Sequence, residues 1–150
     1  MDDQIKTTVS TLNTLIETCN DGAQGFRTAA QELENSSLKQ LFNDYARQRA
    51  QFADQLREEV RRLGGTPDEG GSVSGAMHRG WMNIKSAIAG KSDSAIVAEA
   101  ERGEDVAVKA YEKAIRSDLP PQVRLTVQRQ FTEVQSAHDR VRGFEKTQTR

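Results

Sequence analysis

Three polar side chains stand where the helical pattern of this sequence would otherwise place apolar ones: Arg49, Glu104 and His138. Glu101 lies three positions before Glu104, so both carboxylates share one helix face, and Tyr111 lies two turns further along it. Carboxylate and imidazole groups together can bind a transition metal such as iron or manganese. They can also form a buried network of ion pairs and hydrogen bonds.

Both interpretations are open at the level of sequence. Burying ionised groups singly is costly, so these side chains must pair with one another, with water or with a metal. In the first interpretation Arg49 neutralises Glu104, and His138 completes a metal-free network. In the second, Glu101, Glu104 and His138 bind a metal ion.

A di-iron centre requires more ligands than the chain supplies. Such a centre in a four-helix bundle takes one Glu from each of two helices and a Glu-x-x-His pair from each of the other two. Here Gln135 occupies the carboxylate position before His138, and residues 45–48 (Tyr-Ala-Arg-Gln) contain no histidine. Arg49 would also repel a cation. We therefore expect no intact di-iron site and no bound cofactor, with iron or manganese as the metals of the second interpretation.

Periodic apolar residues predict the helices that position these groups. Apolar side chains recur at alternating spacings of four and three, as at Ile5, Val9 and Leu12, which is typical of helices packed in a bundle. Ser37 and Gln40 fit a capping box at the start of the second helix. The pattern predicts helices over residues 3–33, 37–63, 75–89, 93–117 and 121–145.

The lengths of the connections predict the topology. Tight turns join the first two long helices and the last two, so each pair should form an antiparallel hairpin. Residues 64–91 are long enough to return along the bundle, with a short amphipathic helix at 75–89 that carries Trp81 on its apolar face. One long crossover of this kind is found in ferritin-like folds. We therefore predict a single all-α domain over residues 1–150, a ferritin-like four-helix bundle.

The composition argues against two classes of function. The net charge is −1, from 21 basic and 22 acidic residues, which does not provide the basic field that nucleic-acid binding needs. No apolar run approaches the roughly 18 residues needed to span a bilayer. The polar start at residues 1–4 is unlike a secretory signal, and the single Cys19 excludes an intramolecular disulfide. We expect a cytoplasmic protein.

Several short motifs spread over nearly the whole chain resemble one known family. They are Asp21-Gly22, Phe26, Phe52-Ala53, Leu56, residues 61–65 (Arg-Arg-Leu-Gly-Gly), 78–81 (His-Arg-Gly-Trp), 101–105 (Glu-Arg-Gly-Glu-Asp), Tyr111, Leu119-Pro120 and 137–139 (Ala-His-Asp). Together they are similar to a bacterial, mainly proteobacterial, four-helix-bundle family of unknown function in the ferritin-like superfamily. The resemblance implies a ferritin-like fold, and a fold does not by itself define an activity.

From these observations we expect a non-enzymatic bundle that acts through a protein partner or its own dimer. A role in stress or envelope physiology follows by analogy with other small ferritin-like bacterial proteins. One alternative is a metal-dependent oxidoreductase or metal-handling protein that uses Glu101, Glu104 and His138. Another is a module that binds a partner helix in an apolar groove, exposed when the helix around Trp81 moves away.

Overall fold

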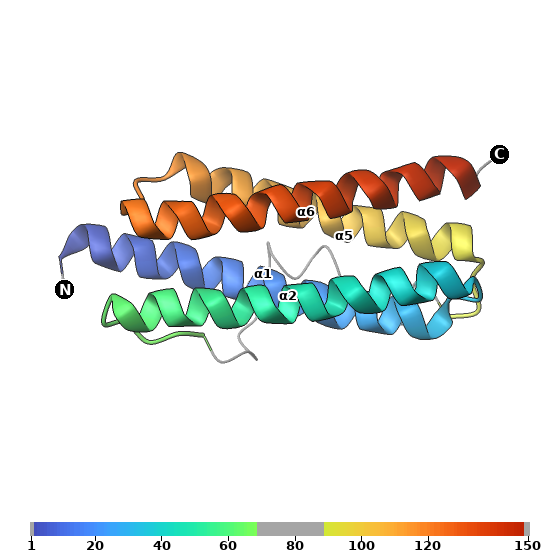
Figure 1. Ribbon diagram of the computed structural model, residues 1–150, viewed down its shortest axis with the longest axis horizontal. Helices are drawn as coiled ribbons and strands as arrows, with labels where there is room; N and C mark the ends of the chain where they lie inside the picture. The colour runs from blue at the N-terminus through green and yellow to red at the C-terminus, as the bar shows by residue number, and fades with distance from the viewer. Residues whose placement is uncertain (1, 69–88, 149–150) are drawn as a thin grey trace.

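The computed structural model describes residues 2–68 and 89–148, and four long helices account for most of them (Figure 1). The helices are α1 (Asp3–Glu32), α2 (Ser36–Arg62), α5 (Asp93–Arg116) and α6 (Pro121–Gln148). The described residues contain no strand, so the all-α prediction is confirmed. The bounds agree with the sequence pattern to within one residue, except that α6 ends three residues later than expected. The helix predicted over 75–89, with Trp81, lies outside the described residues apart from residue 89, which is in a turn.

Polar side chains cap the first turns of three helices. Asp2 accepts a hydrogen bond from the backbone N–H of Ile5 at the start of α1, and Ser92 accepts one from Ala95 at the start of α5. The cap of α2 is Asn35, whose side-chain oxygen lies 3.0 Å from the N of Leu38. The prediction that Ser37 caps this helix is therefore wrong, because Ser37 already lies inside its first turn.

Two glycines end α2 for different reasons. Gly64 has a φ of 82°, in the left-handed region that glycine adopts without a steric penalty. The N–H groups of Gly64 and Gly65 then bond to the carbonyls of Arg61 and Val60, which closes the helix in a Schellman motif. A Cβ at Gly65 would lie only 2.7 Å from a methyl carbon of Val9 on α1. Gly65 thus permits a close approach of α2's end to α1.

The helices occupy the corners of a bundle. Figure 1 shows α1 and α6 running in one direction and α2 and α5 in the other. Helix α1 packs against α2 and α5, while α6 packs against α5 and α2. Helices α2 and α5 are therefore parallel and lie at diagonal corners. This is the arrangement expected from two antiparallel hairpins joined by one long crossover.

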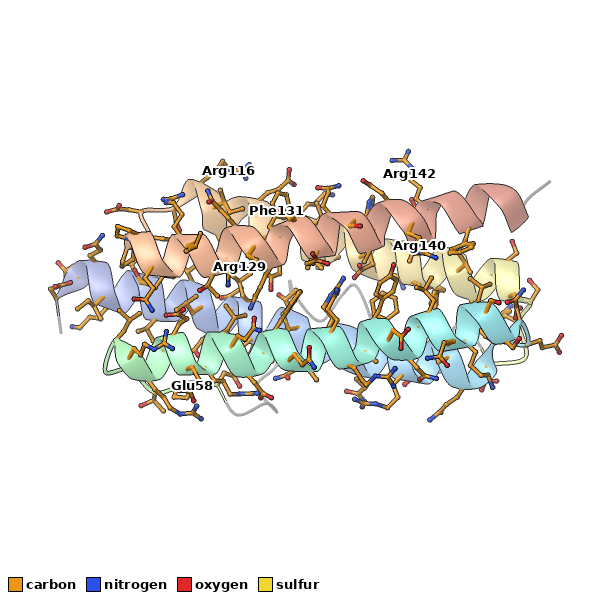
Figure 2. All side chains as sticks on the ribbon, in the orientation of Figure 1. Glu58, Arg116, Arg129, Phe131, Arg140 and Arg142 are labelled. Atoms are coloured by element: carbon orange, nitrogen blue, oxygen red, sulfur yellow. The ribbon has the colours of Figure 1, made fainter. Side chains whose placement is uncertain are left out.

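The hydrophobic core is divided into two clusters, one toward each end of the bundle. The first contains Leu12, Leu15, Ile16, Leu56, Val60, Val123 and Val127 among others. The second contains Phe26, Leu33, Leu38, Phe42, Ile96, Val97 and Val141 among others. Charged side chains such as Glu58, Arg116 and Arg142 point away from the bundle axis (Figure 2). Between the two clusters lies a buried polar layer.

Candidate functional site

The centre of this polar layer is an ion pair across the diagonal of the bundle. Arg49 on α2 extends to Glu104 on α5, and the side chains are 1% and 0% exposed. Nη1 and Nη2 of Arg49 donate to the two carboxylate oxygens of Glu104 at 2.5 and 2.6 Å. The remaining guanidinium nitrogen, Nε, donates to the side-chain oxygen of Gln48. The contact is bidentate and uses both oxygens of Glu104, the geometry that planar guanidinium favours.

The long side chain of Arg49 packs closely against α1. A Cβ at Gly22 on α1 would lie 3.4 Å from Nη1 and 3.5 Å from Cγ of Arg49, so the arginine lies directly against a helix surface that lacks a side chain. The ring of Phe26 lies 5.4 Å from the guanidinium carbon, within cation–π range. Burial lowers the pKa of Arg49, but the charge and hydrogen bonds of Glu104 outweigh this and raise the pKa above its ordinary value. Arg49 is thus a permanent cation at the bundle centre.

A second buried group links all four helices next to this pair. The hydroxyl of Tyr111 on α5 donates to the side-chain oxygen of Gln130 on α6 at 2.7 Å and lies 3.1 Å from Sγ of Cys19 on α1. The amide nitrogen of Gln130 bonds in turn to the side-chain oxygen of Gln55 and the carbonyl of Phe52, both on α2. Every buried side-chain nitrogen or oxygen among the described residues has a hydrogen-bond partner.

Burial changes the acidity of this second group. It raises the pKa of the Cys19 thiol to about 11, although the hydrogen bond with Tyr111 and the charge of Arg49 act in the opposite direction. Burial also raises the pKa of Tyr111 well above its ordinary value, and the neighbouring Cys19 adds to this effect. Both groups are neutral at physiological pH. Cys19 is therefore a buried, protonated thiol, unlike the thiolate of a nucleophilic cysteine.

His138 belongs to a third group, at the edge between α5 and α6. Its Nε2 lies 2.5 Å from a carboxylate oxygen of Asp105, and its Nδ1 lies 3.3 Å from one of Asp139. Glu101 stands one turn before Asp105 on α5, and one ligand atom from each of Glu101, Asp105 and His138 lies within 4.8 Å of the others. The side chain of His138 is 9% exposed and that of Asp105 is 52% exposed.

The structure thus divides the five residues singled out by the sequence among three groups. Arg49 and Glu104 form one pair, Tyr111 joins Cys19 and Gln130, and His138 lies near Glu101. Glu104 points across the diagonal of the bundle toward Arg49, whereas His138 lies at the edge between α5 and α6. The prediction that His138 completes the network of Arg49 and Glu104 is therefore wrong. The alternative metal-ligand set also changes, because Arg49 engages both oxygens of Glu104 and Asp105 lies beside His138 instead.

Asp105 and Gln130 are the site residues that sequence reasoning missed. Asp105 is the fourth residue after Glu101, a spacing that places two carboxylates on one helix face. Gln130 lies on the stripe of α6 that is actually buried, with Val127 and Val134 on either side. Gln130 lies three residues after Val127 and four before Val134, a helical spacing that was a usable signal. Phe131, which is four residues after Val127 and three before Val134, fits the same spacing but is only partly buried.

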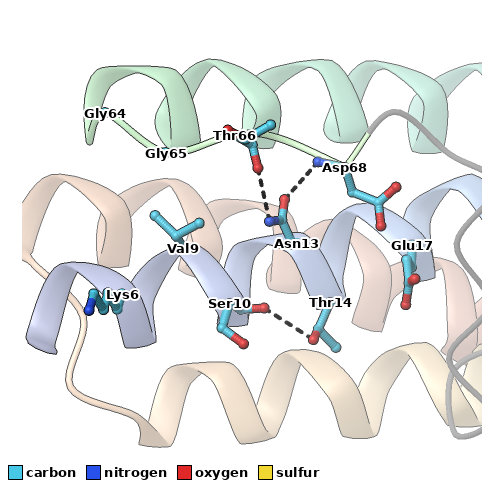
Figure 3. A pocket seen from close by; sticks show the side chains of 10 residues that line it. All are labelled: Lys6, Val9, Ser10, Asn13, Thr14, Glu17, Gly64, Gly65, Thr66 and Asp68. Atoms are coloured by element: carbon cyan, nitrogen blue, oxygen red, sulfur yellow. Dashed lines mark hydrogen bonds between the residues drawn. The ribbon is translucent and has the colours of Figure 1, made fainter. Parts of the chain in front are cut away.

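A groove with a volume of about 540 Å³ lies between α1 and the residues after α2 (Figure 3). The amide of Asn13 bridges this groove: its nitrogen donates to the carbonyl of Thr66 and its oxygen accepts from the N–H of Asp68. Arg57 on α2 donates to the carbonyl of Asp68. These contacts tie the start of the crossover to α1 and α2, which is a structural role.

No helix among the described residues is long and apolar enough to cross a membrane. The helix order and the diagonal arrangement define a ferritin-like four-helix bundle. Residues 7–117 match the family described as a domain of unknown function, DUF2383, and the chain belongs to this family. The structure is similar to that of a Dps1 mutant of Mycobacterium smegmatis, with a TM-score of 0.78, 13% sequence identity, and coverage of 97% of this chain and 99% of that chain. At this identity the likeness shows the fold alone. A search of curated proteins finds no match to the sequence.

Proposed function

We propose that this protein is a non-enzymatic ferritin-like bundle whose centre is held by an ion pair instead of metal ions, and that it acts by binding. The observation that supports this is the bidentate contact of Arg49 with Glu104, both fully buried. A permanent cation next to the central carboxylate repels a metal ion, and it already takes up both carboxylate oxygens.

The donor set at the centre supports the same proposal. An iron site in a bundle needs several carboxylates and imidazoles that converge on the metal. The groups around Glu104 are instead a guanidinium, a phenol, a thiol and an amide. Each buried side-chain nitrogen and oxygen among the described residues already has a hydrogen-bond partner. No side chain at the centre is therefore left with an unused ligand atom for a metal. These residues do not fit a di-iron centre.

With an ion pair instead of metal ions at its centre, we expect the bundle to act by binding, either to a second copy or to a protein partner. A role in stress physiology remains a prediction by analogy. Under this proposal the helices present surface side chains on a rigid scaffold. Light scattering coupled to size-exclusion chromatography measures whether the partner is a second copy.

Ferrous iron tests the proposal directly. Untagged protein is mixed aerobically with Fe²⁺, and the rate of iron oxidation and the iron bound per chain are measured. We expect no acceleration over buffer and no pair of iron ions bound at the centre. Binding of two iron ions per chain, with faster oxidation that is lost on Glu104→Gln but kept on Glu112→Gln, would sink the proposal.

A further inference from the structure

The group at the edge between α5 and α6 has the composition of a metal site that is separate from the bundle centre. We propose that Glu101, Asp105 and His138 bind one divalent transition-metal ion, with Zn²⁺ as the probe that should bind most tightly among Mn²⁺, Fe²⁺, Co²⁺ and Zn²⁺. One imidazole with two carboxylates is a ligand set that such ions accept. This inference goes beyond the proposed function and does not depend on it.

The spacing of the residues supports the proposal. Glu101 and Asp105 are four residues apart on α5 and so lie on one face, while His138 reaches them from α6. Metal–ligand distances of about 2.0–2.2 Å place ligand atoms about 3.3–3.6 Å apart in the tetrahedral geometry that Zn²⁺ prefers. The ligand atoms here lie within 4.8 Å of one another. The partly exposed carboxylates therefore need only a small side-chain adjustment to close around an ion.

The orientation of His138 is a second, independent observation. Its Nε2 points toward Asp105 and the site, while Nδ1 faces Asp139 at 3.3 Å. Metal-binding histidines usually donate their other ring N–H to a carboxylate, which fixes the tautomer that presents a lone pair to the metal. Gln135 bonds to the same oxygen of Asp139 and so helps to hold it. The imidazole is nearly buried and is held in the orientation that a metal ligand needs.

The charge around the imidazole also favours a cation. Three carboxylates, from Glu101, Asp105 and Asp139, surround His138. The guanidinium of Arg142, which is 58% exposed, lies 3.7 Å from Glu101. Arg142 projects from the outer side of α6 (Figure 2), where it can turn into solvent when a metal binds. Because Asp105 is half exposed, a bound ion would keep coordination positions open to water or to a small anion.

Zinc titration of the untagged chain tests this site. After chelation and dialysis, Zn²⁺ binding is measured by calorimetry in the wild type and in Asp105→Asn and Glu101→Gln. Asp105 is exposed, and Glu101 is partly buried with a side chain that is 18% exposed; because each amide has nearly the shape of the carboxylate that it replaces, the variants should fold. We expect one Zn²⁺ per wild-type chain and at least a tenfold weaker affinity in each variant. Asp139→Asn should weaken binding about tenfold, because His138 would lose the group that orients it.

Two matched controls locate the ion. Glu112→Gln removes an exposed carboxylate of α5 outside the group, and His78→Gln removes the other histidine of the chain; both should bind Zn²⁺ as the wild type does. The imidazole NMR signals of His138 should shift on titration. The proposal is overturned by an absence of Zn²⁺ binding, by unchanged affinity in Asp105→Asn, or by loss of binding in His78→Gln. None of these results affects the ion pair at the centre, so the two proposals fail separately.

Discussion

At the scale of single residues, the buried ion pair is stable because it is complete. An ionised group loses several kcal/mol of hydration when it is buried, and a partner compensates for this only with good geometry and further hydrogen bonds. Arg49 satisfies that condition: its Nη atoms bond to both oxygens of Glu104, and its Nε bonds to Gln48. Each member of the pair therefore makes the burial of the other tolerable.

Removing one member should be far worse than removing both. Arg49→Met leaves the carboxylate of Glu104 buried without its partner, and we expect a loss of about 3–5 kcal/mol in the free energy of unfolding. Glu104→Leu should be similarly damaging, because it leaves the guanidinium unpaired. The double variant should lie within about 1 kcal/mol of the wild type or above it. Urea denaturation of the four proteins measures these differences, and additive losses in the double variant would contradict the account.

The buried thiol predicts a loss of stability at alkaline pH. The pKa of Cys19 is about 11 in the folded protein, against an ordinary value of 9.0, so the unfolded chain releases the proton first. The stabilising effect is complete below pH 9 and is lost as the pH rises toward 11, at about 1.4 kcal/mol per pH unit in that window. The measurement is the stability of the wild type minus that of Cys19→Ala in urea at pH 8, 9, 10 and 11. A difference that does not change with pH would refute this prediction.

The sequence identified some of these residues and misplaced others for a physical reason. Arg49 and Glu104 could be predicted because a charge on an apolar seam must find a partner inside the bundle. His138 lies at the edge of the buried face of α6. The spacing of residues within one helix does not distinguish the centre of that face from its edge, about 100° around the helix axis. The contact of His138 with Asp105 depends on how α5 and α6 pack side by side, which the spacing within either helix does not give.

At the scale of secondary-structure elements, two glycines should respond differently to replacement by alanine. Gly65→Ala would place Cβ at 2.7 and 2.9 Å from the methyl carbons of Val9, so we expect a loss of about 1–3 kcal/mol from overpacking. At Gly22 a Cβ would meet Arg49 at 3.4 Å, an ordinary contact, and alanine raises helix propensity. For Gly22→Ala we therefore expect the free energy of unfolding to fall by at most about 0.5 kcal/mol or to rise by up to about 1 kcal/mol. Thermal unfolding of the wild type and the two variants measures these differences. Equal changes in Tm for Gly65→Ala and Gly22→Ala would be inconsistent with the packing described.

The start of α2 gives a second prediction at this scale. Asn35→Ala removes the side chain that accepts from the N–H of Leu38, and it should lower stability by about 1 kcal/mol. Ser37→Ala lies inside the first turn and should change it by less than about 0.5 kcal/mol. Circular dichroism during urea unfolding is a sufficient measurement. A larger effect at Ser37 than at Asn35 would favour the capping box expected from the sequence.

The long elements were predictable and the cap of α2 was not, because the helices follow from local spacing and this cap lies beside a contact with a distant part of the chain. Apolar spacing, Pro120-Pro121 and Gly64-Gly65 are local signals that set the helices to within a few residues. We attribute the choice of Asn35 over Ser37 to α5, whose Asp93 accepts hydrogen bonds from the backbone N–H groups of Glu34 and Asn35. No pattern within residues 33–40 contains that contact.

At the scale of the whole molecule, one carboxylate joins the two hairpins at the end of the bundle. Asp93, at the start of α5, accepts from the backbone N–H groups of Glu34 and Asn35, both at 2.9 Å. Asp93→Ala should cost about 1–3 kcal/mol, because two hydrogen bonds to a charged group are lost. Asp118 at the opposite end is the control: it accepts one exposed bond from Gln4, and its alanine variant should cost less than about 0.5 kcal/mol. Equal losses in urea denaturation would contradict this role for Asp93.

The topology itself could be predicted from connection lengths alone. Two short turns and one long link leave few ways to arrange four helices of similar length, and the structure has the arrangement with α2 and α5 parallel. Connection lengths do not define how deeply each helix face is buried. That is why the fold was predicted more completely than the grouping of polar residues inside it.

The diagonal ion pair has a further consequence, for the axial alignment of the two hairpins. Apolar seams of Leu, Val and Ala repeat every turn, so sliding one hairpin past the other by a turn would still bury apolar surface. Such a slip moves Glu104 by about 5.4 Å relative to Arg49 and leaves both charges buried and unpaired. The pair therefore makes one register of the hairpins much more stable than its neighbours. A single buried salt bridge at the centre thus determines the axial position of one hairpin relative to the other.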